Sequence, residues 1–387
     1  MHSLAWPVAH ADSKQQYITV SLSADQSALS PEERGKEVRT LITGGAGFIG
    51  SHVAERLLGE GREVAIIDDL NDYYDPRLKQ QNLAIARRLG AVAFYQGDIC
   101  NEELVAAAFA EFRPDAVIHL AARAGVRPSL DEPSLYTHVN CVGTVTLLEA
   151  ARKTGTRKFV FASSSSVYGV SPNVPFKESD TDLHPISPYA GTKLAGEQLA
   201  HTYALLYGLQ VICLRFFTVY GPRQRPDLAI RKFIQCVEEG RELPFYGDGL
   251  MGRDYTYISD TVDGILAALH LDRPFDIFNL GHSSPVTLRE MVAEIERATG
   301  KQAKLKRLPV PAGDVPLTFA DLTKSEALLG YRPKVEFRDG IQRMVDWYRR
   351  SGESNADSVA GLLALAGQSG EPASSPHSAE DCPVQKD

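Results

Sequence analysis

Tyr189 and Lys193 stand four residues apart in the segment SPYAGTKLAGEQLAHTY, whose pattern predicts a helix. A spacing of four places both side chains on one face of that helix, one turn apart. An ammonium group beside a phenol favours the phenolate and lowers the pKa of the phenol, which makes the tyrosine a usable base near neutral pH. Such a pair is common by chance, and in isolation a solvated pair on a helix surface is the simpler interpretation. The surrounding elements therefore have to support the chemistry.

A run of four serines, Ser163–Ser166, supplies the first support. It closes the apolar run KFVFAS (158–163), which predicts a strand one crossover before the helix. A hydroxyl at such a strand end can share a proton with a phenol and a substrate. We therefore interpret Tyr189, Lys193 and a serine of this run as one catalytic set.

A glycine-rich turn at 43–50, TGGAGFIG, follows an apolar run at 38–43 and opens a helical pattern at 48–58. Glycines let the backbone turn tightly, approach a pyrophosphate closely and pack helix against sheet, while the N–H groups at the helix N-terminus attract phosphate. The turn is therefore predicted to bind a dinucleotide. The residues predicted to contact the cofactor are Gly44, Gly47, Phe48, Ile49 and Gly50.

Asp68 ends the next predicted strand, EVAIID (63–68). A carboxylate at that place accepts both hydroxyls of the adenosine ribose and repels a 2′-phosphate, so NAD is predicted in preference to NADP. Asp98, followed by Ile99, ends the third predicted strand and is placed to contact the adenine. An alternative role for Asp98 is to cap the helix that follows.

The apolar runs that carry these residues alternate with amphipathic segments. They lie at 38–43, 63–68, 91–96, 115–120, 158–163 and 209–217. Continuous apolar strands separated by helices predict an α/β fold with a Rossmann-type doubly wound parallel sheet, covered on both faces. Helical patterns continue at 227–239, 261–271, 287–299 and 338–350.

This pattern divides the chain into four regions. Residues 37–217 are predicted to form the dinucleotide-binding domain, with elements near 256–285 returning to it, and residues 218–350 a smaller α/β substrate-binding lobe. Residues 1–36 and 351–387 are rich in Ser, Ala, Asp and Glu. They are predicted to be poorly ordered extensions, the second of them acidic.

The composition argues against several other classes of protein. The chain has 387 residues and a formal net charge of −8, whereas binding to nucleic acid requires a basic surface. Its five cysteines form no CxxC pair, and no group of potential ligands has the spacing of a metal site, so we expect a reducing compartment and no metal. No apolar stretch approaches the ~18 residues of a membrane span, and the N-terminus does not resemble a signal peptide. We therefore expect a cytoplasmic protein with no nucleic-acid or membrane partner.

With these motifs in this order, the chain resembles the extended short-chain dehydrogenase/reductases, and within them the nucleotide-sugar epimerase/dehydratase group. The resemblance covers about residues 37–350. Further segments similar to that group are HLAARAGVRPS (119–129), VNCVGT (139–144), LRFFTVYGPRQRPD (214–227), GRDYTYISD (252–260), NLG (279–281) and GDVPLTFAD (313–321).

The resemblance implies bound NAD and transient oxidation at C4 of a sugar carried on a nucleoside diphosphate. Tyr189 would take the proton of the 4-hydroxyl, and Lys193 would hold the nicotinamide ribose and keep Tyr189 acidic. Ser164 would hydrogen-bond the 4-hydroxyl.

The resemblance also implies binding residues and a partner. Asn140 would lie near the cofactor, and Arg253 would contact the diphosphate, where a planar guanidinium makes bidentate contacts. Such proteins commonly form homodimers through two helices, which would fall at 133–154 and 188–207 in this chain.

The two residues after Ser164 narrow the chemistry. In the dehydratases of the group these positions carry Asp-Glu, because elimination of water needs an acid and a base, and the uronate decarboxylases carry Glu at the second position. Ser165 and Ser166 stand there in this chain, and neither can do that work. The resemblance therefore implies 4-epimerisation, by oxidation at C4 and re-reduction from the opposite face.

UDP-glucuronate is the substrate implied, because the chain resembles the UDP-glucuronate 4-epimerases at AGVR (124–127), LRFFTVYGP (214–222), RPD (225–227) and GDVP (313–316). A uronate carboxylate needs donors without an acidic neighbour, which Ser164–Ser166, Thr218 and Arg225 can supply. The substrate-binding residues predicted in this way are Arg127, Ser165, Ser166, Thr218, Arg225, Arg253 and Asp314, with Arg223 completing a basic pocket.

Three alternatives stay open. One is 4-epimerisation of UDP-glucose or UDP-N-acetylglucosamine, because the small side chain of Thr318 can admit an N-acetyl substituent. The others are a non-catalytic sensor that binds NAD and a reductase that consumes the cofactor stoichiometrically.

Overall fold

The computed structural model describes residues 38–310 and 315–351. The predicted extensions at 1–36 and 351–387 lie outside the described residues, except for Ser351. Within the described ranges, no helix is both long enough and apolar enough to cross a membrane.

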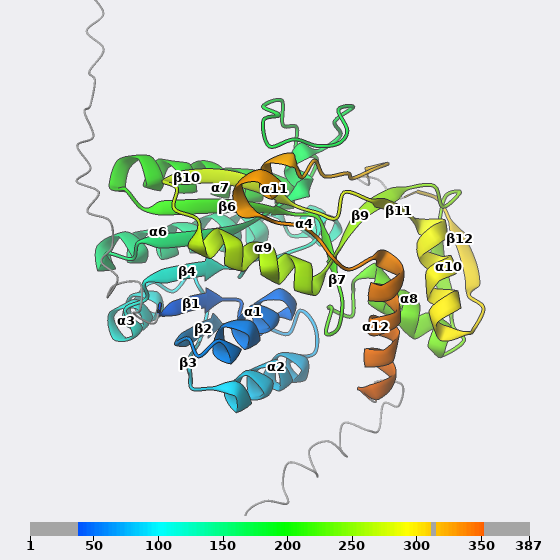
Figure 1. Cartoon of the computed structure of the whole chain (residues 1–387), viewed down its shortest axis with the longest axis horizontal. Helices are drawn as coiled ribbons and strands as arrows, with labels where there is room; N and C mark the ends of the chain where they lie inside the picture. Colours follow the sequence, from blue (N-terminus) through cyan, green and yellow to red (C-terminus); the bar gives the residue numbers. More distant parts are fainter. Residues whose placement is uncertain (1–37, 311–314, 352–387) are drawn as a thin grey trace, which may run out of the picture. The chain divides into compact units, whose positions relative to one another are not determined.

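Seven parallel strands form the main sheet, in the order β10-β6-β5-β4-β1-β2-β3 (Figure 1). The strands are β1 (Thr40–Thr43), β2 (Val64–Asp68), β3 (Val92–Gln96), β4 (Ala116–His119), β5 (Lys158–Ser164), β6 (Gln210–Phe216) and β10 (Phe275–Leu280). Six of them coincide with the apolar runs of the sequence, and the order is that of a doubly wound Rossmann sheet with one strand added. The predicted fold class is confirmed.

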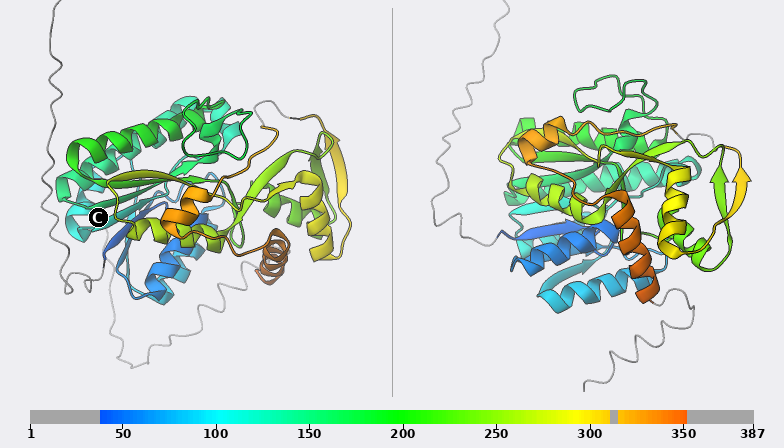
Figure 2. Two further views of the ribbon diagram at one scale, coloured as in Figure 1. Left: turned by 45° about the horizontal axis from the view of Figure 1, so that its top comes forward. Right: turned by 45° about the vertical axis from the view of Figure 1, so that its right-hand side comes forward.

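Helices cover both faces of this sheet (Figure 2). One face carries α1 (Phe48–Gly59), α2 (Pro76–Leu89) and α9 (Ile258–His270), and the other carries α3 (Glu102–Phe112), α6 (Gly143–Thr154) and α7 (Pro188–Tyr207). Because both faces are covered, every residue of β1, β2 and β4 is buried, which explains why these strands appear in the sequence as unbroken apolar runs.

A second group of elements lies to the right of the large sheet in Figure 1. It contains a three-stranded sheet of β7 (Thr218–Tyr220), β9 (Gly252–Tyr257) and β11 (Pro285–Thr287), and a parallel pair of β8 (Glu242–Tyr246) and β12 (Lys304–Leu308). Its helices are α8 (Ala229–Glu238), α10 (Leu288–Thr299) and α12 (Phe337–Arg350). These strands were not predicted, because most of them carry no apolar run, as in KLKRL of β12 and GRDYTY of β9.

The remaining helical elements are short. They are α4 (Val126–Asp131), α5 (Pro133–Thr137), the π-helical turn η2 (His138–Val142), the 3₁₀ turn η3 (Ser165–Tyr168) and α11 (Thr323–Leu329).

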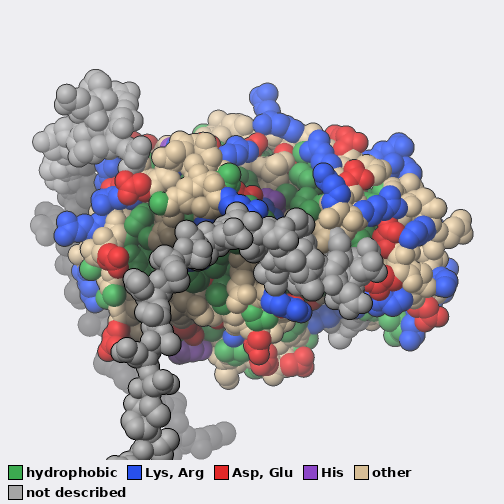
Figure 3. Space-filling model, turned by 90° about the horizontal axis from the view of Figure 1, so that it is seen from below, with side chains coloured by type: hydrophobic (Ala, Val, Ile, Leu, Met, Phe, Trp, Pro, Cys, Tyr) green, Lys and Arg blue, Asp and Glu red, His purple; other side chains and the backbone are tan. Residues whose placement is uncertain are grey.

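On the face drawn in Figure 3, basic and acidic side chains are interspersed.

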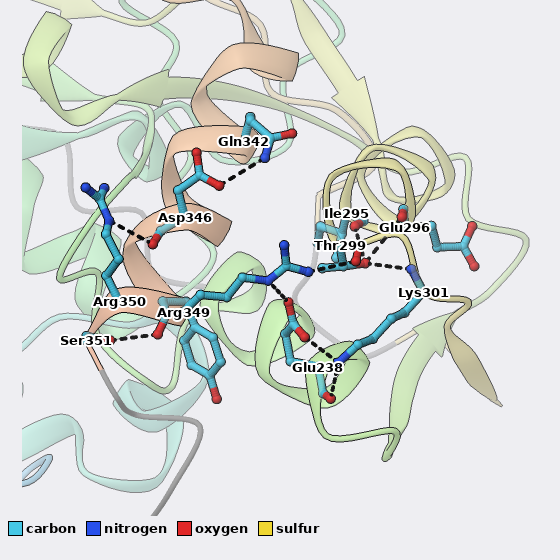
Figure 4. A network of polar contacts seen from close by, with 11 residues as sticks. Glu238, Ile295, Glu296, Thr299, Lys301, Gln342, Asp346, Arg349, Arg350 and Ser351 are labelled. Atoms are coloured by element: carbon cyan, nitrogen blue, oxygen red, sulfur yellow. Dashed lines mark hydrogen bonds and ion pairs between the residues drawn. The ribbon is translucent and has the colours of Figure 1, made fainter. Parts of the chain in front are cut away.

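Glu238 joins the three helices of the second group (Figure 4). It ends α8 and accepts hydrogen bonds from Arg349 of α12, at 2.6 Å, and from Lys301, which follows α10. Lys301 also donates to the Glu238 carbonyl oxygen at 2.7 Å. The Glu238 side chain is only 8% exposed, whereas the Lys301 and Arg349 side chains are 47% and 44% exposed.

Glu238→Gln is expected to lower the free energy of unfolding by about 1.5–3 kcal/mol, the range for hydrogen bonds to a charged group. Burial by itself raises the pKa of Glu238, but Lys301 and Arg349 bring it below its ordinary 4.5. The stabilisation is therefore present above that pH and is lost as the pH falls through the lower pKa of the folded state. Denaturant unfolding at pH 7 and pH 4 measures both effects. Glu294→Gln, which removes the single pairing of a more exposed carboxylate with Arg297, should cost less than about 1 kcal/mol.

Candidate active site

A cleft of about 490 Å³ opens where the parallel strands end, beside the point at which the strand order reverses between β1 and β4. This is the position where doubly wound sheets bind ligands, and the volume lies in the range of ligand pockets. The predicted residues that line it are Gly44, Gly47, Phe48, Ile49, Gly50, Asp68, Asp98, Ile99, Ser164, Ser165, Ser166, Tyr189, Lys193, Thr218, Arg225 and Arg253.

The turn between β1 and α1 fits a dinucleotide phosphate. Gly44 has φ of +69°, and a Cβ there would lie 2.8 Å from the backbone nitrogen of Ala121. A Cβ on Gly50 would lie 2.2 Å from the Gly44 carbonyl oxygen, so the turn closes only with glycine at both positions. Helix α1 has no side-chain cap and no acidic residue in its first turn, so its N-terminus offers backbone N–H groups and positive potential to an anion.

Asp68 ends β2 as predicted and is buried. Its carboxylate accepts the N–H of Ala46 at 3.1 Å and that of Leu70 at 2.9 Å. The Nζ of Lys79, from α2, lies 3.6 Å from Asp68 and 3.7 Å from Asp69. Burial raises the pKa of Asp68, while Lys79 and the two N–H groups act in the opposite direction.

Lys79 was missed from the sequence, although the structure places it in the wall of the cleft. The sequence shows only that Lys79 lies in an amphipathic helix, and that pattern does not distinguish a buried lysine from a solvated one. Two roles were predicted for Asp98, contact with the adenine and capping of the next helix. The capping role is wrong, because the side chain accepts the N–H of Cys100 at 2.8 Å and does not cap that helix. Asn101 caps α3 instead, by accepting the N–H of Leu104.

Tyr189 and Lys193 lie in the first turns of α7, whose start is set by Pro188 and by the hydroxyl of Ser187, which accepts the N–H of Ala190. Lys193 is buried and donates through Nζ to the carbonyl oxygen of Ala162 at 2.7 Å. Its ammonium group lies 6.0 Å from the centre of the Tyr189 ring.

The electrostatics of Tyr189 differ from the expectation. Burial raises the pKa of Tyr189, and a hydrogen bond with Ser164 and the charge of Arg225 counteract this. Burial also lowers the pKa of Lys193, to about 8. We expected Lys193 to make the phenol more acidic, but in the described residues Arg225 is the cation that does so, and Lys193 is directed at a backbone carbonyl.

Ser164 ends β5, and its hydroxyl accepts hydrogen bonds from the Ser166 hydroxyl at 2.9 Å and from the Ser166 N–H at 3.2 Å. The turn η3 thereby holds three hydroxyl groups of Ser164, Ser165 and Ser166 at the wall of the cleft beside Tyr189. The neighbouring Thr218 begins β7. This side of the cleft is thus rich in hydroxyl groups.

Arg225 adds a fixed cation to the cleft wall. Its Nε and Nη2 bind the carboxylate of Asp227 at 3.0 and 2.8 Å, so the expectation of a donor without an acidic neighbour is wrong for Arg225. Its guanidinium lies 5.3 Å from the centre of the Tyr73 ring, in the loop after β2. Tyr73 and Arg123 also line the cleft, and neither was singled out from the sequence.

The structure does not place every predicted residue in the cleft wall. Arg127 lies over the ring of Tyr246, 5.2 Å from its centre, and Arg223 pairs with Glu55. Asn140 is buried behind the wall, where it hydrogen-bonds the backbone of Arg123 and the hydroxyl of Thr192. The predicted basic pocket therefore keeps Arg225 and Arg253 of its four members, and Asp314 lies outside the described residues. Across the described part of the chain, no three His, Cys, Asp or Glu side chains gather as metal ligands.

Comparisons with known proteins agree on one family. A family model described as GDP-mannose 4,6 dehydratase matches residues 41–344. The UDP-glucuronate 4-epimerase of Thermodesulfobacterium geofontis is 43% identical over 315 residues, which cover 80% of this chain and 96% of that protein.

Solved structures are similar over the same part of the chain. The UDP-glucose 4-epimerase of Thermotoga maritima with UDP-glucose has a TM-score of 0.76 and 34% identity, covering 81% of this chain and 99% of that one. The UDP-glucuronic acid 4-epimerase of Bacillus cereus, in complex with UDP-glucuronic acid and NAD, has a TM-score of 0.74 and 34% identity, covering 81% and 100%.

Proposed function

Because the chain belongs to the nucleotide-sugar epimerase and dehydratase family of extended short-chain dehydrogenase/reductases, we propose that it is an NAD-dependent 4-epimerase that converts UDP-glucuronate to UDP-galacturonate. The observation that carries this proposal is the turn η3, where hydroxyl groups alone follow Ser164. The acidic residues of the described cleft wall are Asp68, Asp69 and Asp98, and they lie at or just after the ends of β2 and β3. Elimination of water, which needs an acid and a base beside the sugar, has no support there.

The residues have distinct tasks in this reaction. NAD, held by the glycine turn before α1 and by Asp68, would supply the hydride acceptor for oxidation at C4 and the hydride donor for re-reduction from the opposite face. The Tyr189 oxygen accepts the proton of the 4-hydroxyl and gives it back when the hydroxyl is re-formed. Ser164, hydrogen-bonded to Tyr189, orients the hydroxyl, and Lys193 is held on the Ala162 carbonyl, where it can bind the nicotinamide ribose.

The sugar side of the cleft favours a uronate. Ser165, Ser166 and Thr218 offer hydroxyl donors, and Arg225 offers a charge-assisted donor. Asp227 engages Nε and Nη2 of Arg225, and Nη1 takes part in neither of those bonds. Arg253, on β9, is assigned to the diphosphate, which is common to all UDP-sugars.

Incubating the full chain with UDP-glucuronate, with and without added NAD, tests the function. Proton NMR of the product should show UDP-galacturonate with no net NADH formation. UDP-xylose would establish decarboxylation, and stoichiometric NADH consumption with a keto-sugar would establish a reductase. Faster turnover of UDP-glucose or UDP-N-acetylglucosamine would favour the second candidate, which rests on the small Thr318 in the cleft wall. No turnover of any UDP-sugar would favour a sensor.

A homodimer formed through α6 and α7 is part of the proposal. The end of α7 exposes Leu205, Leu206 and Tyr207, which are 73%, 63% and 51% accessible, and such contiguous apolar surface is typical of interaction sites. We also propose that the protein works in the cytoplasm, because the four cysteines among the described residues are free thiols.

Leu205→Glu combined with Leu206→Glu is expected to convert the dimer to a monomer, because two carboxylates would be buried at the contact between α7 helices. Light scattering after size-exclusion chromatography measures the mass. Leu328→Glu, on α11, introduces one carboxylate at a side chain that is 37% exposed and should leave the mass unchanged. A parent chain with monomeric mass would contradict the proposed dimer.

A further inference from the structure

Three residues of α7, spaced one helical turn apart, contact three successive residues at the end of β5. Tyr189 hydrogen-bonds Ser164, and Lys193 donates to the carbonyl oxygen of Ala162 at 2.7 Å. One turn after Lys193, Glu197 accepts a hydrogen bond from the hydroxyl of Ser163 at 2.5 Å. The third attachment uses none of the residues assigned to the reaction.

Arg215 holds this glutamate. Its Nε and Nη2 donate to the two carboxylate oxygens of Glu197 at 2.9 and 2.8 Å. Arg215 lies on β6, in register with Ser163 on β5, so the pair spans the helix and both strands. The Glu197 and Arg215 side chains are 0% and 2% exposed.

The surroundings of the pair are apolar and aromatic. The guanidinium of Arg215 lies 4.7 Å from the centre of the Tyr168 ring. Desolvating two charges costs about as much as their attraction returns, and well-packed apolar side chains often stabilise such a position equally well. Stabilisation of the fold is therefore a weak explanation for a buried charged pair at this place, one helical turn from Lys193.

We propose that Glu197, held by Arg215, is a positioning residue that keeps Lys193 protonated and directed at the Ala162 carbonyl. The inference rests on the proposed roles of Tyr189 and Lys193. Glu197 would act on the reaction through Lys193, because neither Glu197 nor Arg215 lines the described cleft wall.

The groups around Lys193 determine the sign of the effect. They are Tyr189 and Glu197 on α7, Cys141 on η2 and His119 on β4, while Arg215 on β6 contacts Glu197. Burial lowers the pKa of Lys193 to about 8, and Cys141 and Glu197 raise it. His119 is buried and neutral, with its pKa lowered to about 3 by burial and by Lys193. Removing the charge of Glu197 therefore lowers the pKa of Lys193 further.

The pH dependence of kcat in four proteins tests the inference: the parent, Glu197→Gln, Glu197→Asp and Glu197→Gln combined with Arg215→Gln. In Glu197→Gln, Arg215 stays as an unopposed buried cation, so the alkaline limb should move down by about one pH unit and kcat at pH 8 should fall about fivefold. The double variant removes both charges, so its limb should lie between those of the parent and the single variant. Glu197→Asp keeps the charge and should keep the limb near that of the parent. KM should change less than kcat in all of them.

A direct titration of Lys193 makes the result independent of turnover. Lysines labelled with ¹³C at Cε are followed by NMR, and the Lys193 resonance is identified by its loss in Lys193→Met. The expected order of pKa is parent, double variant, Glu197→Gln. Coincident limbs and coincident lysine titrations in folded variants would overturn the inference. An inactive parent in which the titrations differ would instead overturn the proposed function and leave the inference in place.

Discussion

Replacing Tyr189 with phenylalanine is expected to lower kcat about 10²–10⁴-fold, the contribution of a positioned general base. The hydroxyl is the only part removed, and the ring keeps its edge-to-face contact with Tyr136, whose centre lies 6.3 Å away. The fold and the cofactor site should therefore be retained. Initial rates with UDP-glucuronate measure the loss, and absorbance of bound nucleotide measures cofactor content.

Tyr136→Phe is the matched control for this prediction. It removes the hydroxyl of the neighbouring tyrosine, which donates to the Ala124 carbonyl oxygen behind the cleft wall. Most of the activity should remain in this variant. A Tyr189→Phe protein that retains a tenth or more of the parent kcat would assign the base to another group.

Arg225→Met is expected to raise KM for UDP-glucuronate about 10- to 100-fold, because one charge-assisted hydrogen bond contributes about 1.5–3 kcal/mol and 1.4 kcal/mol corresponds to tenfold. KM for UDP-glucose should change little, because that sugar has no carboxylate. The variant should also lower kcat with both substrates at neutral pH, because loss of the Arg225 charge raises the pKa of Tyr189 further and leaves less of the phenolate. Steady-state kinetics with the two UDP-sugars separate these effects.

Arg253→Met supplies the contrast for Arg225. A contact to the diphosphate serves every UDP-sugar, so this variant should raise KM for UDP-glucuronate and for UDP-glucose by similar factors. Equal losses for both sugars in Arg225→Met would remove Arg225 from the recognition of the carboxylate. The two arginines are thus distinguished by substrate preference rather than by the size of the effect.

Local patterns were sufficient to predict the large sheet. An apolar run such as 158–163 predicts its strand because burial on both faces leaves no polar alternation, and the structure ends that strand at Ser164. The last strand, β10, was not predicted as a strand, because Asp276 and Asn279 interrupt the apolar residues of its segment FDIFNL. Its place beside β6 depends on packing across the sheet rather than on its own pattern.

The polar contacts behind the site could not be predicted from the sequence. Tyr73 contacts Arg225 from a loop about 150 residues earlier in the chain, and Lys79 is an ordinary helix lysine until α2 packs beside Asp68. Glu197 and Arg215 are 18 residues apart, on a helix and a strand, and nothing in their spacing predicts a bidentate pair. The predicted basic pocket also lost Arg223, which pairs with Glu55 on α1 instead.

The sequence by itself determined the chemistry that residues close along the chain can express: the glycine turn, the carboxylate at the end of β2, the serine run and the spacing of Tyr189 and Lys193. These follow from helix and strand periodicity, which acts over a few residues. Only the tertiary structure decided which cation acts on Tyr189 and what holds Lys193 in place. The reason is physical, because the pKa of a buried group depends on burial and on the charges within a few ångströms, and those neighbours come from distant segments of the chain.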